Sequence, residues 1–171
     1  MLSLLNQNIL HSKDALTSSP YFSHVKHDTE WNLYIAKHCH KSDVTNPVVK
    51  QGDGTIINSD GNVVCYSGEY GETYFHSDIT NPDQTDLQQT LGDLSVYDVL
   101  EYMDGTCIRL YYHNNEWRTA TKGHTDANRA KWSSEKSFGV LFQEVLDEYK
   151  HFSYDLLNPE YTYVFLLQHV D

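Results

Sequence analysis

The chain has 171 residues, of which 39% are apolar and 21% are charged, and its formal net charge at pH 7 is −12. This length and composition predict a soluble protein with a core of its own, and no stretch approaches the ~20 apolar residues of a membrane span. The acidic balance disfavours nucleic-acid binding, because affinity for phosphate backbones comes mainly from Lys and Arg.

The negative charge is concentrated in the middle of the chain. Residues 51–100 contain nine Asp or Glu and no Lys or Arg. Such a block is typical of a solvated face that aids solubility, and it also favours protein or cationic partners over RNA. We therefore expect a protein partner, and weak or no binding to nucleic acid.

The cysteines and the N-terminus indicate the compartment. The three cysteines are far apart and form no Cys-x-x-Cys motif, and the start lacks the basic region and apolar run of a signal peptide. An odd number of cysteines favours free thiols in a reducing compartment. We expect the protein in the cytoplasm or elsewhere inside the cell, or in a virion, and not in a membrane.

The first half of the chain predicts a short helix and then strands. Apolar residues at roughly helical spacing indicate a helix over 2–17, which Ser18-Ser19-Pro20 ends. We assign 1–28 to an N-terminal helical extension and 29–171 to the main domain. A mostly apolar run predicts a strand over 30–36, and 41–47 is expected to be a polar loop.

A hairpin and a long loop come next. The Asp60-Gly61 step is a strong turn signal, and it predicts a hairpin with strands over 55–58 and 62–66. The Gly, Asp, Thr and Asn content of 67–94 predicts an irregular loop, with a helical turn near 87–91.

The second half predicts four more strands and one clear helix. We expect strands over 99–103, 107–113 and 117–121, and the last two are joined at Asn114-Asn115. Apolar residues at i, i+3, i+4, i+7, i+8 and i+11 predict a helix over 137–152. A final strand is expected over 161–167. The fold class is therefore α+β, with a mainly antiparallel twisted sheet and a few flanking helices.

Four segments in order resemble the RNA ligases of the nucleotidyltransferase superfamily, which includes the capping enzymes. Residues 51–64 are similar to the ligases' Cys-Arg-Gly-Ile-x-Phe segment and following hairpin, with Asp53 at the arginine. Residues 73–76 are similar to Lys-Phe-Phe-Asn, with Thr73 at the lysine. Residues 102–105 are similar to Lys-x-Asp-Gly and are followed by a strand pair and the step Thr121-Lys122-Gly123. Residues 161–167 are similar to Thr-Tyr-x-Phe-Glu-Leu.

The region after residue 110 also resembles ligase-like proteins of large DNA viruses. The resemblance implies a fold like part of a nucleotidyltransferase core, whose active site lies between two sheets. The family's later Glu-Gly and Lys-x-Lys strands have no counterpart in the sequence. Two interpretations stay open, a truncated relative and a fragment of a longer protein.

The resemblance also implies a degenerate nucleotide-binding site. Tyr102 stands where the family has the lysine that becomes adenylylated, and a phenol cannot form the phosphoramidate of that reaction. We therefore assign no catalytic residue. The positions that correspond to the family's nucleotide site are Tyr102, Asp104, Gly105, Lys122 and Phe165.

Simpler interpretations stand beside these assignments. Asp104 before Gly105 is equally natural as a turn residue, and Lys122 as a solvated lysine at a hairpin end. His38, Cys39 and His40, with two histidines upstream, have the residue types of metal ligands but no second pair at zinc-finger spacing, so we expect no metal site. ATP and Mg²⁺ would be cofactors only under the ligase interpretation.

The sequence thus favours a non-catalytic RNA ligase-like protein that acts by binding a protein partner, and it leaves open whether a nucleotide also binds. One alternative is an RNA ligase or capping-type nucleotidyltransferase, or a fragment of one. The other is a structural or virion-associated protein that has kept only the scaffold.

Overall fold

The computed structural model describes residues 22, 24–38, 42–43, 46–68, 93–96, 98, 100 and 103–168. The chain divides into two compact units, one made of 1–70 and 104–171 and the other of 71–103. In the second unit the described residues include a single 3₁₀ turn, η1 (Leu94–Val96). The helix expected over 2–17 and most of the loop expected over 67–94 lie outside the described residues.

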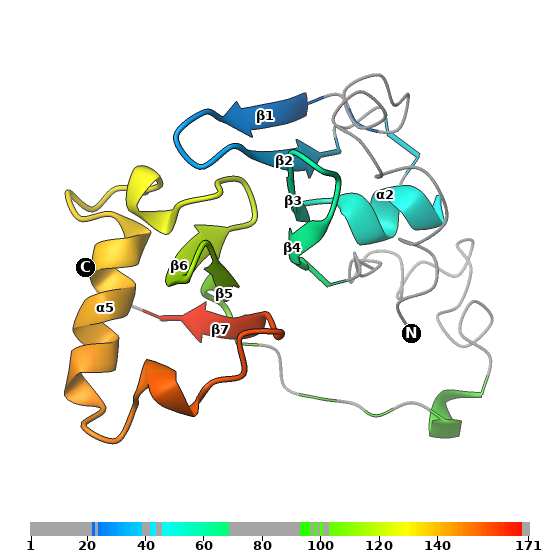
Figure 1. Cartoon of the computed structure of the whole chain (residues 1–171). Helices are drawn as coiled ribbons and strands as arrows, with labels where there is room; N and C mark the ends of the chain where they lie inside the picture. The colour runs from blue at the N-terminus through cyan, green and yellow to red at the C-terminus, as the bar shows by residue number, and fades with distance from the viewer. Residues whose placement is uncertain are drawn as a thin grey trace. The chain divides into compact units, whose positions relative to one another are not determined.

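One antiparallel sheet of the first unit has four strands in chain order (Figure 1). They are β1 (His24–Asp28), β2 (Leu33–Lys37), β3 (Ile56–Asn58) and β4 (Val63–Cys65). The strand expected over 30–36 is β2, which begins later because the turn between β1 and β2 includes Asn32 at a φ of 53°. The sequence places residues 24–28 in an N-terminal helical extension, whereas the structure shows a strand there. The sequence of β1 has one apolar residue, so its strand conformation comes from pairing with β2 and not from a local pattern.

The hairpin predicted around Asp60-Gly61 is confirmed as β3 and β4. Gly61 has a φ of 83°, and the Asn58 side chain accepts hydrogen bonds from the backbone of Asp60 and Asn62. Helix α2 (Pro47–Gly52) was not predicted. The signals for it are Asn46, whose side chain caps the helix at the Val48 N–H, and a proline at the first helical position.

The other antiparallel sheet has three strands in the order β6-β5-β7. They are β5 (Thr106–His113), β6 (Glu116–Thr121) and β7 (Tyr163–Leu167). Asn114 and Asn115 both have positive φ, at 52° and 62°, which suits a tight hairpin turn and confirms the predicted β5–β6 pair. The strand expected over 99–103 is not seen at Leu100 or Met103, and its other residues lie outside the described part.

The predicted C-terminal helix is confirmed as α5 (Phe138–Glu148), which is followed by the short turn η3 (Tyr154–Leu156). The Ser137 side chain caps α5 at the Val140 N–H, as expected. The helix ends four residues before 152. Its apolar stripe packs on β5 and β7 in one buried cluster, whose members are Ile108, Ala127, Leu141, Phe142, Leu146 and Leu167.

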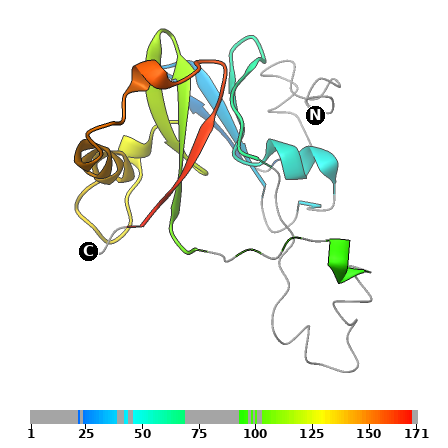
Figure 2. The ribbon, with the colours of Figure 1, turned by 90° about the horizontal axis from the view of Figure 1, so that it is seen from below.

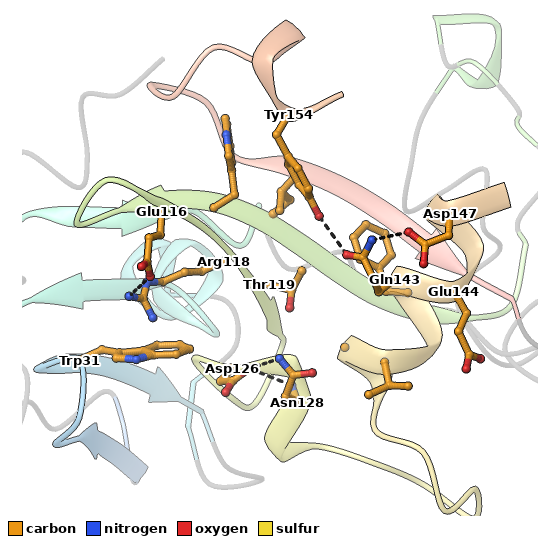
Figure 3. Close-up of a pocket in the computed structure, with 15 residues that line it drawn as sticks. Trp31, Glu116, Arg118, Thr119, Asp126, Asn128, Gln143, Glu144, Asp147 and Tyr154 are labelled. Carbon is orange, nitrogen blue, oxygen red and sulfur yellow. Dashed lines mark hydrogen bonds and ion pairs between the residues drawn. The ribbon is translucent and has the colours of Figure 1, made fainter. Parts of the chain in front are cut away.

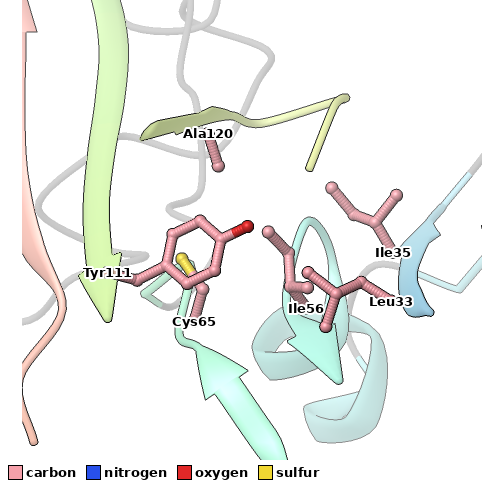
Figure 4. Close-up of a cluster of buried hydrophobic side chains, with 6 residues drawn as sticks. All are labelled: Leu33, Ile35, Ile56, Cys65, Tyr111 and Ala120. Atoms are coloured by element: carbon pink, nitrogen blue, oxygen red, sulfur yellow. The ribbon is translucent and has the colours of Figure 1, made fainter. Parts of the chain in front are cut away.

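The two sheets meet through a second buried cluster, shown in Figure 4. Its members are Leu33, Ile35, Ile56, Cys65, Tyr111 and Ala120. Helix α5 covers one face of the β6-β5-β7 sheet, and the four-stranded sheet packs on the opposite face (Figure 2). The α+β class is confirmed, but the strands form two antiparallel sheets where we expected one. Within the described residues, no helix is long and apolar enough to cross a membrane.

Candidate functional site

Two lysines, Lys26 and Lys37, reach Gly123 just after β6 ends, and we call them, together with Lys122, the residue before Gly123 in the chain, the lysine cluster. Lys26 on β1 donates a hydrogen bond from Nζ to the Gly123 carbonyl at 3.2 Å. Lys37 ends β2, and its Nζ lies 3.1 Å from where a Cβ on Gly123 would stand. The β1–β2 register puts Lys26 and Lys37 on the same face of their sheet. A quarter of the chain's 12 Lys and Arg residues therefore contact Gly123 or precede it directly, in a protein whose net charge is −12.

Asp53 faces Lys122 across this site. It follows α2 directly and is only 3% exposed. Its Oδ2 lies 2.8 Å from Lys122 Nζ, and its Oδ1 accepts a hydrogen bond from the His38 N–H at 3.0 Å. Burial alone would raise the pKa of Asp53, but the hydrogen bonds from Lys122 and His38 and the charge of Lys122 outweigh it and lower that pKa. Asp53 is thus a carboxylate at neutral pH.

A buried arginine holds the backbone around the lysine cluster. Arg109 is 1% exposed, and its guanidinium donates to the Gly54 carbonyl at 2.6 Å and to the Thr121 carbonyl at 2.7 Å. Gly54 has a φ of +80°, and a Cβ there would stand 3.0 Å from the Lys122 carbonyl oxygen. The turn after α2 and the end of β6 are therefore held side by side. The positive φ and the close approach of the two backbones explain why residue 54 is a glycine.

The charges of Lys26 and Lys37 affect the pKa of His124. It pairs with Thr121 through backbone hydrogen bonds of 3.1 and 3.4 Å. Burial lowers the pKa of His124, and the charges of Lys26 and Lys37 lower it further, while the charge of Asp126 opposes this shift. Lys26 and Lys37 form no ion pair with any residue that the structure describes. Within the described residues, two ammonium groups that form no ion pair therefore lie beside Gly123, and a bound anion would stabilise them.

The structure brings two of the ligase-like segments together. Asp53, from the first segment, and Lys122, from the Thr-Lys-Gly step, form the ion pair described above. Lys26, Lys37, Arg109 and His124 were not predicted, because no motif joins residues that come from three different strands and a turn.

The other predicted site residues lie elsewhere. Tyr102 is outside the described residues. Asp104 accepts a hydrogen bond from the Gly105 N–H at 2.9 Å, and its carbonyl accepts one from the Gln168 side chain, just after β7, at 2.7 Å. A Cβ on Gly105 would stand 2.8 Å from the Leu167 carbonyl oxygen, so β5 and β7 approach closely there.

Phe165 is part of the core beneath α5. Its ring packs edge to face on Phe142, with centroids 5.0 Å apart. This contact is on the α5 face of the three-stranded sheet, whereas Lys122 reaches Asp53 on the opposite face. Phe165 and Lys122 are therefore not neighbours in one site.

A polar pocket of about 520 Å³ lies between α5 and β6, where Trp31 also lines it (Figure 3). Most of its polar groups bond to one another. Arg118 pairs with Glu116 at 2.9 Å and stacks on Trp31 at 3.9 Å, and Gln143 donates to Asp147 at 2.7 Å. Since these groups already have partners within the protein, the pocket offers a ligand less than the lysine cluster does.

Among the described residues, no group of three His, Cys, Asp or Glu is placed to hold a metal ion. His27 instead stacks on Tyr34, with ring centroids 4.2 Å apart, and His38 contacts Asp53. Cys39 and His40 lie outside the described residues.

Comparison with known proteins identifies a viral relative. The chain is 29% identical over 122 residues to a protein of Invertebrate iridescent virus 3, described as an immediate-early protein ICP-46 homolog. The alignment covers 67% of this chain and 26% of that relative, so the chain spans about a quarter of the relative's length. No protein-family model matches the chain, and no solved structure matches it.

Proposed function

We propose that this chain is a non-catalytic, ligase-like protein that acts by binding. Its lysine cluster holds the phosphates of a nucleotide, and a protein partner completes its action. The observation that carries the nucleotide part is that Lys26 and Lys37 meet at Gly123, next to Lys122 and beside two segments that resemble the RNA ligases.

Two residues, Asp53 and Tyr102, support nucleotide binding without adenylyl transfer. Where the ligases have an arginine, Asp53 puts a negative charge against Lys122, which weakens the stabilisation of developing phosphate charge. Where they have the nucleophilic lysine, Tyr102 offers no amine. A nucleotide would therefore be held but not transferred.

A small phosphate ligand suits the site better than a nucleic acid does. Surface charges are screened beyond ~8–10 Å at physiological salt, so the lysines act on groups close to Gly123. A long phosphate backbone would also meet the acidic remainder of a chain with a net charge of −12. The ligand class is thus a mononucleotide with two or more phosphates.

The coarse architecture is compatible with the ligase-like interpretation, and the relative bears only on a viral origin. Antiparallel strands in two facing sheets are compatible with part of a nucleotidyltransferase core. The relative comes from an iridescent virus, which agrees with an origin of this chain in a large DNA virus.

Calorimetric titration of ATP into the whole chain, followed by intact-mass measurement, tests the proposal. Charge-assisted hydrogen bonds contribute about 1.5–3 kcal/mol, so Lys37→Met should weaken ATP binding roughly tenfold or more. Lys150→Met makes the same charge change beyond the end of α5 and should leave the affinity unchanged. The mass after incubation with ATP and Mg²⁺ should not change.

Two results would contradict the proposal. A mass gain equal to AMP would show that the chain is an enzyme, the first alternative. An equal loss of affinity in both lysine variants would show that ATP responds to overall charge and not to the lysine cluster.

A further inference from the structure

Strand β7 is an open edge of its sheet. It pairs with β5 on one side, and within the described residues no strand pairs with its other side. Two of its apolar side chains are exposed, Val164 to 62% and Leu166 to 44%. Proteins usually protect such edges with charges, proline or a covering segment, because unpaired backbone groups accept a further strand.

An apolar groove of about 610 Å³ runs beside this edge, between β7 and the second half of α5. Its apolar lining includes Val145, Leu146, Tyr149, Phe152, Phe165 and Leu166. Tyr149 is 66% exposed even though it continues the apolar stripe of α5. The groove and the strand edge therefore form one continuous apolar surface.

The geometry of a strand matches this surface. Side chains of an extended segment alternate between two faces. Beside β7, one set would enter the groove next to Phe165, and the other set would cover the face that carries Val164. Backbone hydrogen bonds to a sheet edge give such complexes their affinity, and pockets for alternate side chains give them specificity.

The charges around the groove indicate which charges a bound strand should have at its two ends. Asp104 precedes β5, Glu148 ends α5, and Asp155 and Glu160 lie between α5 and β7, all of them exposed. Lys150 is the one Lys or Arg between Glu148 and β7, and His151 beside it also lines the groove. Basic flanks on the occupant would complement this rim, whereas a second copy of this chain would bring two acidic rims together.

We propose that the β7 edge binds an extended segment of a partner protein, apolar at every second residue and basic at both ends. This inference rests on the proposed action through a protein partner and gives that partner its chemistry. It uses residues distinct from the lysine cluster, so nucleotide binding and partner binding can fail separately.

The test uses a synthetic peptide with the sequence Lys-Lys-Val-Thr-Val-Thr-Val-Thr-Lys-Lys and the whole chain. Fluorescence anisotropy measures its binding, and amide hydrogen exchange locates it. We expect binding together with slower exchange in β7. A peptide with glutamates in place of the lysines should bind at least tenfold more weakly at low salt.

A matched pair of variants distinguishes peptide binding at the β7 edge from non-specific hydrophobic binding. Leu166→Thr keeps a residue suited to a strand but removes apolar contact, and it should weaken peptide binding about fivefold. Leu156→Thr makes the same change at a side chain that is 77% exposed and off the strand, and it should have no effect.

The inference is overturned if neither peptide binds, if both bind equally, or if binding leaves exchange in β7 unchanged. Self-association of the wild-type chain that slows exchange in β7 would also overturn it, since the occupant would then be a second copy. An ATP titration of the same sample reports on the lysine cluster separately, so its success beside a failed peptide test would leave the nucleotide proposal intact.

Discussion

Replacing Asp53 with asparagine should strengthen phosphate binding while it weakens the fold. Asn keeps the shape of the buried side chain and can still accept the hydrogen bond from the His38 N–H, but it has no negative charge. Lys122 then loses the carboxylate that lies 2.8 Å from its Nζ. A phosphate would therefore no longer compete with Asp53 for this lysine.

The size of both effects follows from the surroundings. Unit charges ~4 Å apart interact by about 1 kcal/mol in water and about 4 kcal/mol near a protein surface. The phosphate would sit farther from Asp53 than Lys122 does, so we expect the lower figure, or roughly fivefold tighter ATP binding. The stability loss should be about 1.5–3 kcal/mol, typical of one hydrogen bond to a charged group, because the Lys122 side chain is 52% exposed and can turn to water.

Calorimetry with ATP and urea unfolding followed by circular dichroism measure the two effects. Asp53→Asn should shift the ATP affinity and the unfolding midpoint in opposite directions. Weaker ATP binding by a folded Asp53→Asn variant would refute the view that Asp53 opposes the anion, and would indicate that the carboxylate positions Lys122 for its ligand.

The remaining predictions concern chemistry, charge, packing and pH. Tyr102→Lys alone should not restore adenylylation, as intact mass after incubation with ATP and Mg²⁺ will show. RNA and single-stranded DNA should bind no more tightly than the ~10⁻⁴–10⁻⁶ M of non-specific complexes, and nanomolar binding at physiological salt would contradict this. Phe142→Ala should cost about 3–5 kcal/mol in urea unfolding, because this side chain is 3% exposed. Glu144→Ala, which loses a surface pair with a lysine, should cost about 0–1 kcal/mol, and equal losses would refute the orientation of α5. Burial would raise the pKa of Asp28, but hydrogen bonds and a nearby arginine lower it overall. Its contribution to stability is therefore present above about pH 4 and lost as the pH falls through the lowered pKa, which acid titration of the unfolding midpoint can follow.

Elements with a strong local pattern were predictable from the sequence. The apolar stripe and Ser137 cap of α5 are contained within a few turns of helix, and the positive φ angles of Asn114 and Asn115 suit the predicted hairpin turn. Such features depend on neighbouring residues alone.

Elements that depend on distant residues were not predictable. Strand β1 is a strand because β2 pairs with it, and its own sequence does not alternate. The division of the strands into two sheets depends on the cluster around Tyr111, which draws residues from both sheets. Tertiary packing decides both cases, and the sequence pattern carries little trace of it.

The candidate site shows the same limit. The Thr-Lys-Gly step marked Lys122, but Lys26 and Gly123 are 97 positions apart in the chain and meet only through the fold. Phe165 was predicted from a motif to border a nucleotide, and the structure places it against Phe142 in the core. A sequence motif gives the position of Phe165 along β7, but it does not say which face of the sheet lies near the site.

An NMR titration with ATP tests the central claim most directly, because it reports both binding and place. If the lysine cluster holds the phosphates, the amides of Gly123, Gly54 and Lys26 should shift together as ATP is added, and Lys37→Met should reduce those shifts. Shifts confined to Asp104 and its surroundings, or no shifts at millimolar ATP, would contradict the proposal that this chain binds a nucleotide at the lysine cluster.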